Sequence, residues 1–465
     1  MKPFYVLGVE AEVQNQVGTE IYGMYAALIS LSFMLNMIPD MGITNWNNRE
    51  VALNHRLSAI FGNILRLRFS LAILYLIFSV SIGFILGYNK QQIGWLAILG
   101  VNQILAQSIL FFRSNLSGMH LFKKDSFISI LDRTLLIIGM SYLLWAPHGF
   151  GKFHIEWFII GQTVAYLITI SLAAFWVIRL KSKAETKPSN NQVKHIITAS
   201  LPFAAFSLLG MLLYRTDAVL LERISSPAEA GTYTQGFRFF EAFNMLSFLF
   251  AGLLLPIFSR MIAMKEDISD LLNISHRLLF AATFIVSVTC IFLSEQILNL
   301  VYDHVNQTSV ESFKWLMVGC LGFSMQYIYG TLLTAAGELR KLTIITIIGL
   351  AISLTINFTF IPSQGALASA KASAITQILV WIIQTFYCLR IFKINVFNQF
   401  KESILFAILV VSTGYFLFEI NSDFTIKGLG FTLSVGLFLG LTLIIALGTR
   451  MLSFKNFIQL LKLKS

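Results

Sequence analysis

The sequence predicts an all-α, polytopic membrane protein. Apolar residues make up 56% of its 465 residues and charged residues only 12%. The apolar residues gather in long runs, and residues 344–361 and 431–447, for example, contain no Asp, Glu, Lys or Arg. Runs of this length can cross the hydrocarbon core of a bilayer as helices. Inside lipid, a backbone amide must find its hydrogen-bond partner within its own segment, which favours helices.

The first 18 residues are expected to form only the second half of a helix. Residues 1–18 are apolar at first and then polar, with Glu10, Glu12 and Gln14 in the polar part. The segment is too short to cross a membrane. We therefore expect a first helix that is N-terminally truncated, either because the true start lies upstream or because the chain is shortened.

Thirteen further apolar segments are long enough to span the membrane. We expect them at residues 22–46, 66–88, 93–114, 126–146, 155–179, 196–222, 232–260, 277–301, 313–335, 342–361, 365–390, 402–419 and 428–448. Pro39 should kink or break the first of these spans, because proline lacks the backbone N–H and clashes with the preceding turn.

The distribution of Lys and Arg predicts the orientation of the spans. If the span at 22–46 runs from outside to inside, the inside connections hold 24 Lys and Arg residues, whereas the outside connections hold five. The five are Lys90, Lys152, Arg223, Lys314 and Lys427. Positive residues concentrate on the cytoplasmic side of membrane proteins, so this bias favours both the span count and the orientation.

The longest polar connection, residues 181–195, divides the helices into two groups of six when the truncated helix is counted. We expect an N-terminal lobe at residues 1–180, a cytoplasmic linker at 181–195 and a C-terminal lobe at residues 196–392. Two more helices should follow at residues 400–448. Residues 450–465 should form a basic amphipathic helix on the inner membrane face.

A weak internal repeat relates the two lobes. Gly23-Met24-Tyr25 recurs as Gly231-Thr232-Tyr233, and Asn36-Met37 recurs as Asn244-Met245 at the same offset of 208 residues. Both copies begin a helix that runs from outside to inside, so the repeat is parallel. Parallel six-helix halves around a central site are a transporter arrangement.

The segment from Val13 to Ala52 resembles the opening of Wzx-type polysaccharide and O-antigen flippases of the MOP (multidrug/oligosaccharidyl-lipid/polysaccharide) exporter superfamily. The residues that carry the resemblance are Gly18, Tyr22-Gly23-x-Tyr25, Asp40-x-Gly42 and Arg49, and in the second half Leu201-Pro202, Asp217 and Gly231-x-Tyr233. The resemblance implies two lobes around a central cavity in the bacterial cytoplasmic (inner) membrane. It implies that alternating access carries a lipid-linked oligosaccharide outward, in contact with membrane lipid. A polysaccharide polymerase and chain-length proteins could be further partners.

Seven ionisable residues lie inside the helices near their predicted outer ends. A charge at the centre of a bilayer costs about 2.5–3.5 kcal/mol on insertion scales, so a charge kept inside a span is a functional candidate. The seven come from five helices and should line a wet cavity: Glu10, Arg215, Asp217, Arg238, Glu241, Glu295 and Lys371.

The chemistry of the substrate suggests roles for these residues. The lipid-linked oligosaccharide that the resemblance implies carries a pyrophosphate, which is anionic. The planar guanidinium group of Arg suits phosphate. The candidates to bind it are Arg215, Arg238 and Lys371. The carboxylates that would balance these cations or carry protons are Glu10, Asp217, Glu241 and Glu295. Arg238 and Glu241 share a helix face, whereas Arg215 and Asp217 point in different directions. Any such pair could instead only fix the packing of helices.

A cation site is implied by resemblance to the related lipid II flippases, in which a seventh-helix Asp and eleventh-helix polar groups bind sodium. Asp217 with Asn357 and either Thr355 or Thr359 could form such a site here, because oxygen ligands suit a hard cation. Asn357 could equally bond a neighbouring helix. We expect no other cofactor, and transport could couple to Na⁺ or H⁺.

The inner end of the span at 22–46 is unusually polar. Asp40, Gly42 and Arg49 are candidates for an inner gate, and the alternative is an ordinary helix end with its cap.

Other classes of function fit less well. The sequence has a net charge of +11, but its basic residues lie between the apolar spans rather than together on one face. This distribution argues against nucleic acid binding. The sequence has no P-loop, zinc-protease or serine-hydrolase motif, and its three cysteines lack metal or disulfide spacing. We therefore expect a flippase and no enzyme. The alternatives are a multidrug exporter of the same superfamily and, with less support, a membrane polysaccharide polymerase or glycosyltransferase.

Overall fold

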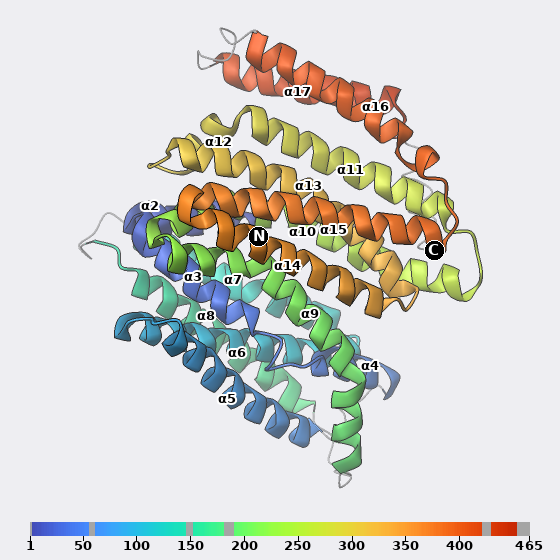
Figure 1. The fold of residues 1–465 in the computed structure, drawn as a ribbon. Coiled ribbons are helices and arrows are strands. Elements are labelled where there is room, and N and C mark those ends of the chain that lie inside the picture. The colour runs from blue at the N-terminus through green and yellow to red at the C-terminus, as the bar shows by residue number, and fades with distance from the viewer. Residues whose placement is uncertain (1, 55–60, 146–151, 181–189, 421–428, 453–465) are drawn as a thin grey trace. The chain divides into compact units, whose positions relative to one another are not determined.

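The computed structural model describes residues 2–54, 61–145, 152–180, 190–420 and 429–452, which form helices joined by turns and short loops (Figure 1). Within these ranges, eleven helices are long and apolar enough to cross a membrane, and no strand occurs. They match eleven of the thirteen predicted spans. The predicted all-α, polytopic fold is therefore confirmed.

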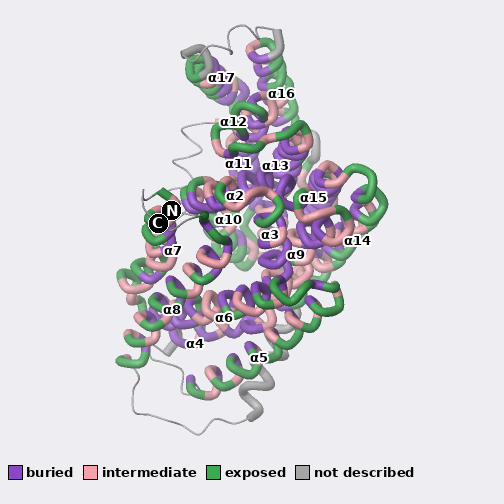
Figure 2. The backbone as a smooth tube through the Cα atoms, turned by 90° about the vertical axis from the view of Figure 1, so that its left-hand side faces the viewer, coloured by how far each residue is buried: buried purple, intermediate pink, exposed green. Residues whose placement is uncertain are grey.

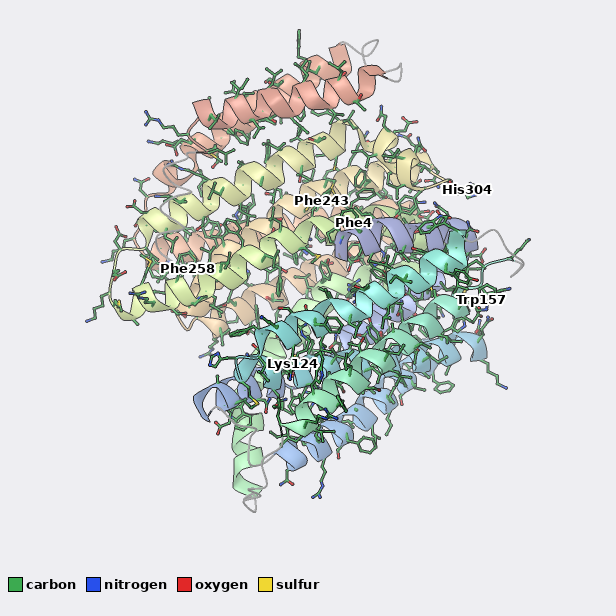
Figure 3. The ribbon with its side chains drawn as sticks, turned by 180° about the vertical axis from the view of Figure 1, so that it is seen from behind. Phe4, Lys124, Trp157, Phe243, Phe258 and His304 are labelled. Carbon is green, nitrogen blue, oxygen red and sulfur yellow. The ribbon has the colours of Figure 1, made fainter. Side chains whose placement is uncertain are left out.

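The chain divides into two compact units, Met1–Thr234 and Gln235–Ser465. The helices of the first unit are α1 (Lys2–Phe4), the π-helix η1 (Tyr5–Glu10), α2 (Ala11–Val17), α3 (Thr19–Met34), α4 (Ile43–Asn54), α5 (Phe61–Ile85), α6 (Lys90–Gly118), α7 (Phe122–Trp145), α8 (Ile155–Arg179) and α9 (Asn190–Ile224). Helix α10 (Pro227–Ala263) contributes its first residues to this unit. Lys124 and Trp157, near the starts of α7 and α8, lie at opposite ends of the unit, as antiparallel helices require (Figure 3).

The second unit contains the rest of α10 and all later helices. These are α11 (Ser269–Phe292), α12 (Ser294–Val301), α13 (Gln307–Ala335), α14 (Leu339–Gln364), α15 (Ala366–Ile391), α16 (Val396–Tyr415), the π-helix η2 (Phe416–Ile420) and α17 (Leu429–Gly448). Helix α13 is largely buried, whereas α14 and α17 expose many residues (Figure 2).

Helices α13 and α15 approach closely because small residues face each other. A Cβ atom on Gly319 would lie 3.1 Å from the Cα of Ala374. In lipid the hydrophobic effect does not drive helices together, so close packing between small residues supplies much of the attraction. This pair forms the centre of the second unit.

A buried histidine connects α16 to α11 and α13 within the second unit. The Nε2 atom of His276 on α11 lies 3.0 Å from the Oγ of Ser403 on α16, and its Nδ1 lies 3.0 Å from the hydroxyl oxygen of Tyr329 on α13. The neighbouring residues Arg277 and Glu402 form an ion pair. Polar contacts thus hold the C-terminal helices to the bundle.

Two predicted spans are interrupted by a break in the structure. The segment 22–46 is not one helix, since α3 ends at Met34 and a turn that contains Pro39 separates it from α4. The structure thus confirms the predicted break near Pro39, whereas the prediction that one span continues to residue 46 is wrong. The span predicted at 277–301 begins at Ser269 and ends at Phe292, because a short break at Leu293 separates α12 from α11.

The predicted division into lobes remains a prediction. The boundary between the two compact units falls within α10, so α9 packs with the first unit rather than with the helices that follow it. Residues 181–189 of the predicted linker and residues 453–465 of the predicted tail lie outside the described residues.

Candidate functional site

Arg238 and Glu241 form a buried ion pair on α10, in the second unit. The Nη1 atom of Arg238 lies 2.6 Å from the Oε2 of Glu241, and the residues are only 6% and 9% exposed. Their three-residue spacing places them on one helix face, as predicted. A guanidinium group carries five N–H donors, so one carboxylate does not exhaust its capacity to bind an anion.

Arg215 and Asp217 lie on α9, in the first unit, and have different neighbours. The hydroxyl of Tyr233 donates to the Oδ2 of Asp217 at 3.1 Å, and Asp217 is buried. The guanidinium carbon of Arg215 lies 4.8 Å from the ring centroid of Phe33 and 5.0 Å from that of Tyr214. The contacts described for the two charged side chains therefore involve different aromatic residues, and their separation on the helix stays a prediction from the spacing.

Glu10 is buried at the end of η1, beside an arginine that the sequence analysis did not select. Arg133 of α7 interacts electrostatically with Glu10, and its guanidinium carbon lies 4.8 Å from the ring centroid of Tyr5 and 6.0 Å from that of Tyr166. A π-helix is rare and frequently occurs at a functional site. The signal that could have found Arg133 is its position inside the predicted span 126–146.

Lys371 and Glu295, in the second unit, are less enclosed than the Arg238 pair. The Nζ of Lys371 donates to the Oε1 of Gln364 at 2.9 Å. Glu295 is exposed in the first turn of α12. Its predicted position within a span is wrong, because the membrane-length helix α11 ends at Phe292, before Glu295 is reached. An exposed carboxylate beyond the span needs no cavity to solvate it.

The polar residues of the proposed cation site do not all face the same way. Asn357 is buried, donates to the backbone oxygen of Ser353 at 3.0 Å and accepts a hydrogen bond from Ser369 at 2.7 Å. Thr355 and Thr359 are exposed, and each donates its hydroxyl to the backbone carbonyl four residues earlier. The threonines are therefore poor ligand candidates. Asp217 lies in the other unit, and its part in such a site stays a prediction.

The predicted inner gate contains a buried ion pair and a helix cap. Asp40 accepts a hydrogen bond from the backbone N–H of Thr44 at 3.2 Å, in the first turn of α4, and pairs with Arg68 of α5. Gly42 has a φ of 80°, in the left-handed region that favours glycine. Arg49 lies on α4, and its side chain is outside the part of the chain that the structure describes.

Arg68 is a second arginine that sequence reasoning missed. Its Nη2 donates to the backbone oxygen of Gln107 at 2.9 Å, and its guanidinium carbon lies 4.8 Å from the ring centroid of Phe111. These contacts and Asp40 satisfy a cation that is only 6% exposed. The sequence placed Arg68 among the cytoplasmic charges, and its partners on α6 and in the turn before α4 are distant in sequence.

The chain matches a known protein family over more than half of its length. A family model described as polysaccharide biosynthesis protein matches residues 12–262. The chain belongs to this family. A further relative, the uncharacterized membrane protein MJ1375 of Methanocaldococcus jannaschii, is 24% identical over 403 residues, which cover 81% of this chain and 92% of the relative.

Two solved structures show the same fold. The lipid II flippase MurJ, in an inward closed conformation, aligns with a TM-score of 0.70 at 15% identity and covers 97% of both chains. An inward-facing multidrug resistance MATE family transporter of the MOP superfamily aligns with a TM-score of 0.60 at 13% identity, over 84% of this chain and 95% of the transporter. The expected fold, which the lipid II flippase and the MATE transporter share, is thereby confirmed. The chain is therefore a multi-pass membrane protein of the polysaccharide biosynthesis family, with a fold that flippases and transporters share.

Proposed function

We propose that this chain is a flippase that moves a lipid-linked pyrophosphate oligosaccharide from the inner to the outer leaflet by alternating access. The observation that carries the proposal is the family match, which links the chain to polysaccharide biosynthesis while the fold is that of flippases and transporters. The product would be a surface polysaccharide such as O-antigen, capsule or exopolysaccharide. The site of action would be the bacterial cytoplasmic membrane.

The buried charges fit an anionic substrate. Arg238 pairs with Glu241 inside a membrane-length helix, and Arg215 lies against aromatic rings in the first unit. The proposed ligands of the pyrophosphate stay Arg215 in the first unit and Arg238 and Lys371 in the second, each taken by itself. Glu10, Asp217 and Glu241 would keep the cations ionised or carry coupling protons. An arginine is better suited than a lysine to phosphate, because its planar donors can bind two oxygens together.

A multidrug exporter is the second candidate, because MATE transporters share this fold. A drug site would favour acidic and aromatic residues, whereas the paired Arg238 supplies a cation.

The polymerase and chain-length proteins of the same biosynthetic system would receive the product and are proposed partners of the flippase.

The test is complementation of a strain that lacks a known polysaccharide flippase, with surface glycan and lipid-linked intermediates measured together. A flippase should restore surface glycan and remove the intermediates that accumulate in the inner leaflet. Resistance to cationic drugs without recovery of glycan would instead identify an exporter. Unchanged glycan in a strain that makes matching intermediates would contradict the proposal.

A further inference from the structure

Helices α3 and α10 cross at contact distance where both begin. A Cβ atom on Gly23 would lie 1.8 Å from the backbone oxygen of Pro227, and one on Gly231 would lie 2.1 Å from the backbone oxygen of Thr19. Both obstacles are backbone atoms, which cannot rotate away as a flexible side chain could. Any residue other than glycine at either position therefore forces the two helices apart.

The crossing is also reciprocal. Each glycine lies four residues after the residue that the opposite helix contacts, Thr19 before Gly23 and Pro227 before Gly231. The two pairs are separated by the 208-residue offset of the internal repeat. A buried side chain adds to the contact, because the Nε2 of Gln14 on α2 donates to the backbone oxygen of Gly231 at 3.0 Å.

The end of α9 is held at the same end of the unit by a second set of contacts. The side chain of Glu222 is fully buried, pairs with Arg223 and accepts a hydrogen bond from the Nε2 of Gln92 at 3.2 Å. The guanidinium carbon of Arg223 lies 4.2 Å from the ring centroid of Tyr88, and its Nη1 donates to the backbone oxygen of Leu86 at 3.3 Å. Helix α9 is thus bound to the turn between α5 and α6.

The turn that receives α9 is itself ordered by a capping box. The Oδ1 of Asn89 accepts a hydrogen bond from the backbone N–H of Gln92 at 2.9 Å, and the Oε1 of Gln92 accepts one from the backbone N–H of Asn89 at 3.0 Å. This arrangement caps the first turn of α6 and orients the side chain of Gln92 toward Glu222. Burial, and secondarily the Glu222 carboxylate, raises the pKa of Tyr88 above its ordinary value.

We propose that the Gly23–Gly231 crossing and the Glu222–Arg223 contacts together form the outer gate, which is closed in this structure. The inference rests on the proposed function, because a gate is needed only if the chain alternates between two open states. Helices α3 and α10 begin, and α9 ends, at the side that the charge bias predicts to be outside. Helices α9 and α10 belong to the predicted C-terminal lobe, whereas α3 and the α5–α6 turn belong to the N-terminal one. Separation of the lobes on this side must break both sets of contacts.

The first test measures exposure of the gate without any substrate. In a variant whose three buried cysteines are replaced by serine, Gln14→Cys would report access of a membrane-impermeant maleimide added outside the cell. Adding Gly23→Ala should raise the labelling rate on the order of ten-fold, because the added methyl group overpacks and destabilises the closed crossing. Gly94→Ala is the matched control, since a Cβ atom there meets nothing within 4 Å. Labelling of Gly23→Ala at the control rate would overturn the gate.

A second test applies if Gly23→Ala does not reach the membrane. Gln92→Cys and Glu222→Cys, joined by a short reducible thiol cross-linker, should hold the gate shut and stop polysaccharide export, and reduction should restore it. Export that continues in the cross-linked protein would overturn the gate. The labelling assay separates this inference from the proposed function, because it requires no transported molecule. Increased labelling of Gly23→Ala, together with no polysaccharide export by the unaltered protein, would support the gate and reject the flippase.

Discussion

The carboxylate of Glu241 lies 2.6 Å from the guanidinium group of Arg238, one turn earlier on the same buried helix. This pair can either hold a substrate or only fix the helix, and the two roles predict different variants. If Arg238 binds pyrophosphate, Arg238→Ala should abolish surface polysaccharide while the amount of protein in the membrane stays near normal. Arg238→Lys should restore only part of the export, because an ammonium keeps the charge and loses the planar fork.

A double variant separates the two roles. If the pair only fixes packing, Arg238→Ala removes the cation that faces the buried carboxylate of Glu241 and lowers the amount of protein in the membrane. Adding Glu241→Ala should then restore both abundance and export. Recovery of surface glycan in the double variant would remove Arg238 from the substrate site.

The Asp40–Arg68 pair should matter for stability more than for recognition. Arg68→Ala leaves the Asp40 carboxylate buried without its cation, which typically costs about 3–5 kcal/mol. We expect a lower unfolding temperature in detergent and partial recovery when Asp40→Asn is added. Lys314→Ala is the control, because its pair with Glu311 is more than one-third exposed and such pairs contribute about 0–1 kcal/mol. Equal losses from the two single variants would contradict this prediction.

The cation site can be tested through residues that differ in burial. Thr355→Val and Thr359→Val should leave export unchanged in sodium and in sodium-free medium, because both hydroxyls are already bonded on the exposed side of α14. Asn357→Ala should destabilise the protein by about 1–3 kcal/mol, because it leaves the buried hydroxyl of Ser369 without its acceptor. Loss of a sodium response in Thr359→Val, at normal abundance, would restore that threonine as a ligand.

The orientation of the chain can be tested with alkaline phosphatase fusions, which are active only outside the cytoplasm. Fusions after Lys187 and after Ser465 should be inactive, because the distribution of Lys and Arg predicts that both positions are cytoplasmic. A fusion after Lys90, in a predicted outer turn, should be active. Activity at Lys187 together with inactivity at Lys90 would reverse the topology.

Hydropathy was sufficient to predict most of the fold. Membrane-length helices are dictated by local composition, and eleven of the predicted spans have counterparts among the described residues. The failures occur where a local break interrupts an apolar run. Leu293 is as apolar as its neighbours, yet the helix breaks there and leaves Glu295 exposed. The apolar residues on both sides of Leu293 led to the prediction of one continuous span.

The candidate site was less predictable, because its partners are distant in sequence. The spacing of Arg238 and Glu241 is local and predicted their pairing. By contrast, Asp40 and Arg68 are 28 residues apart, and Gln92 and Glu222 are 130 residues apart. Charges counted only by their depth in a span cannot reveal which of them the fold will pair.

The reciprocal crossing at Gly23 and Gly231 has a consequence for the origin of the chain. In a symmetric contact, both partners use the same surface. Each half of this chain therefore carries a complete copy of the contact surface. A half-length ancestor could therefore have closed this crossing as a homodimer, with its own glycine against that of a second copy. Gene duplication would then have joined two copies without a new contact, and a larger residue at either glycine would open the same crossing.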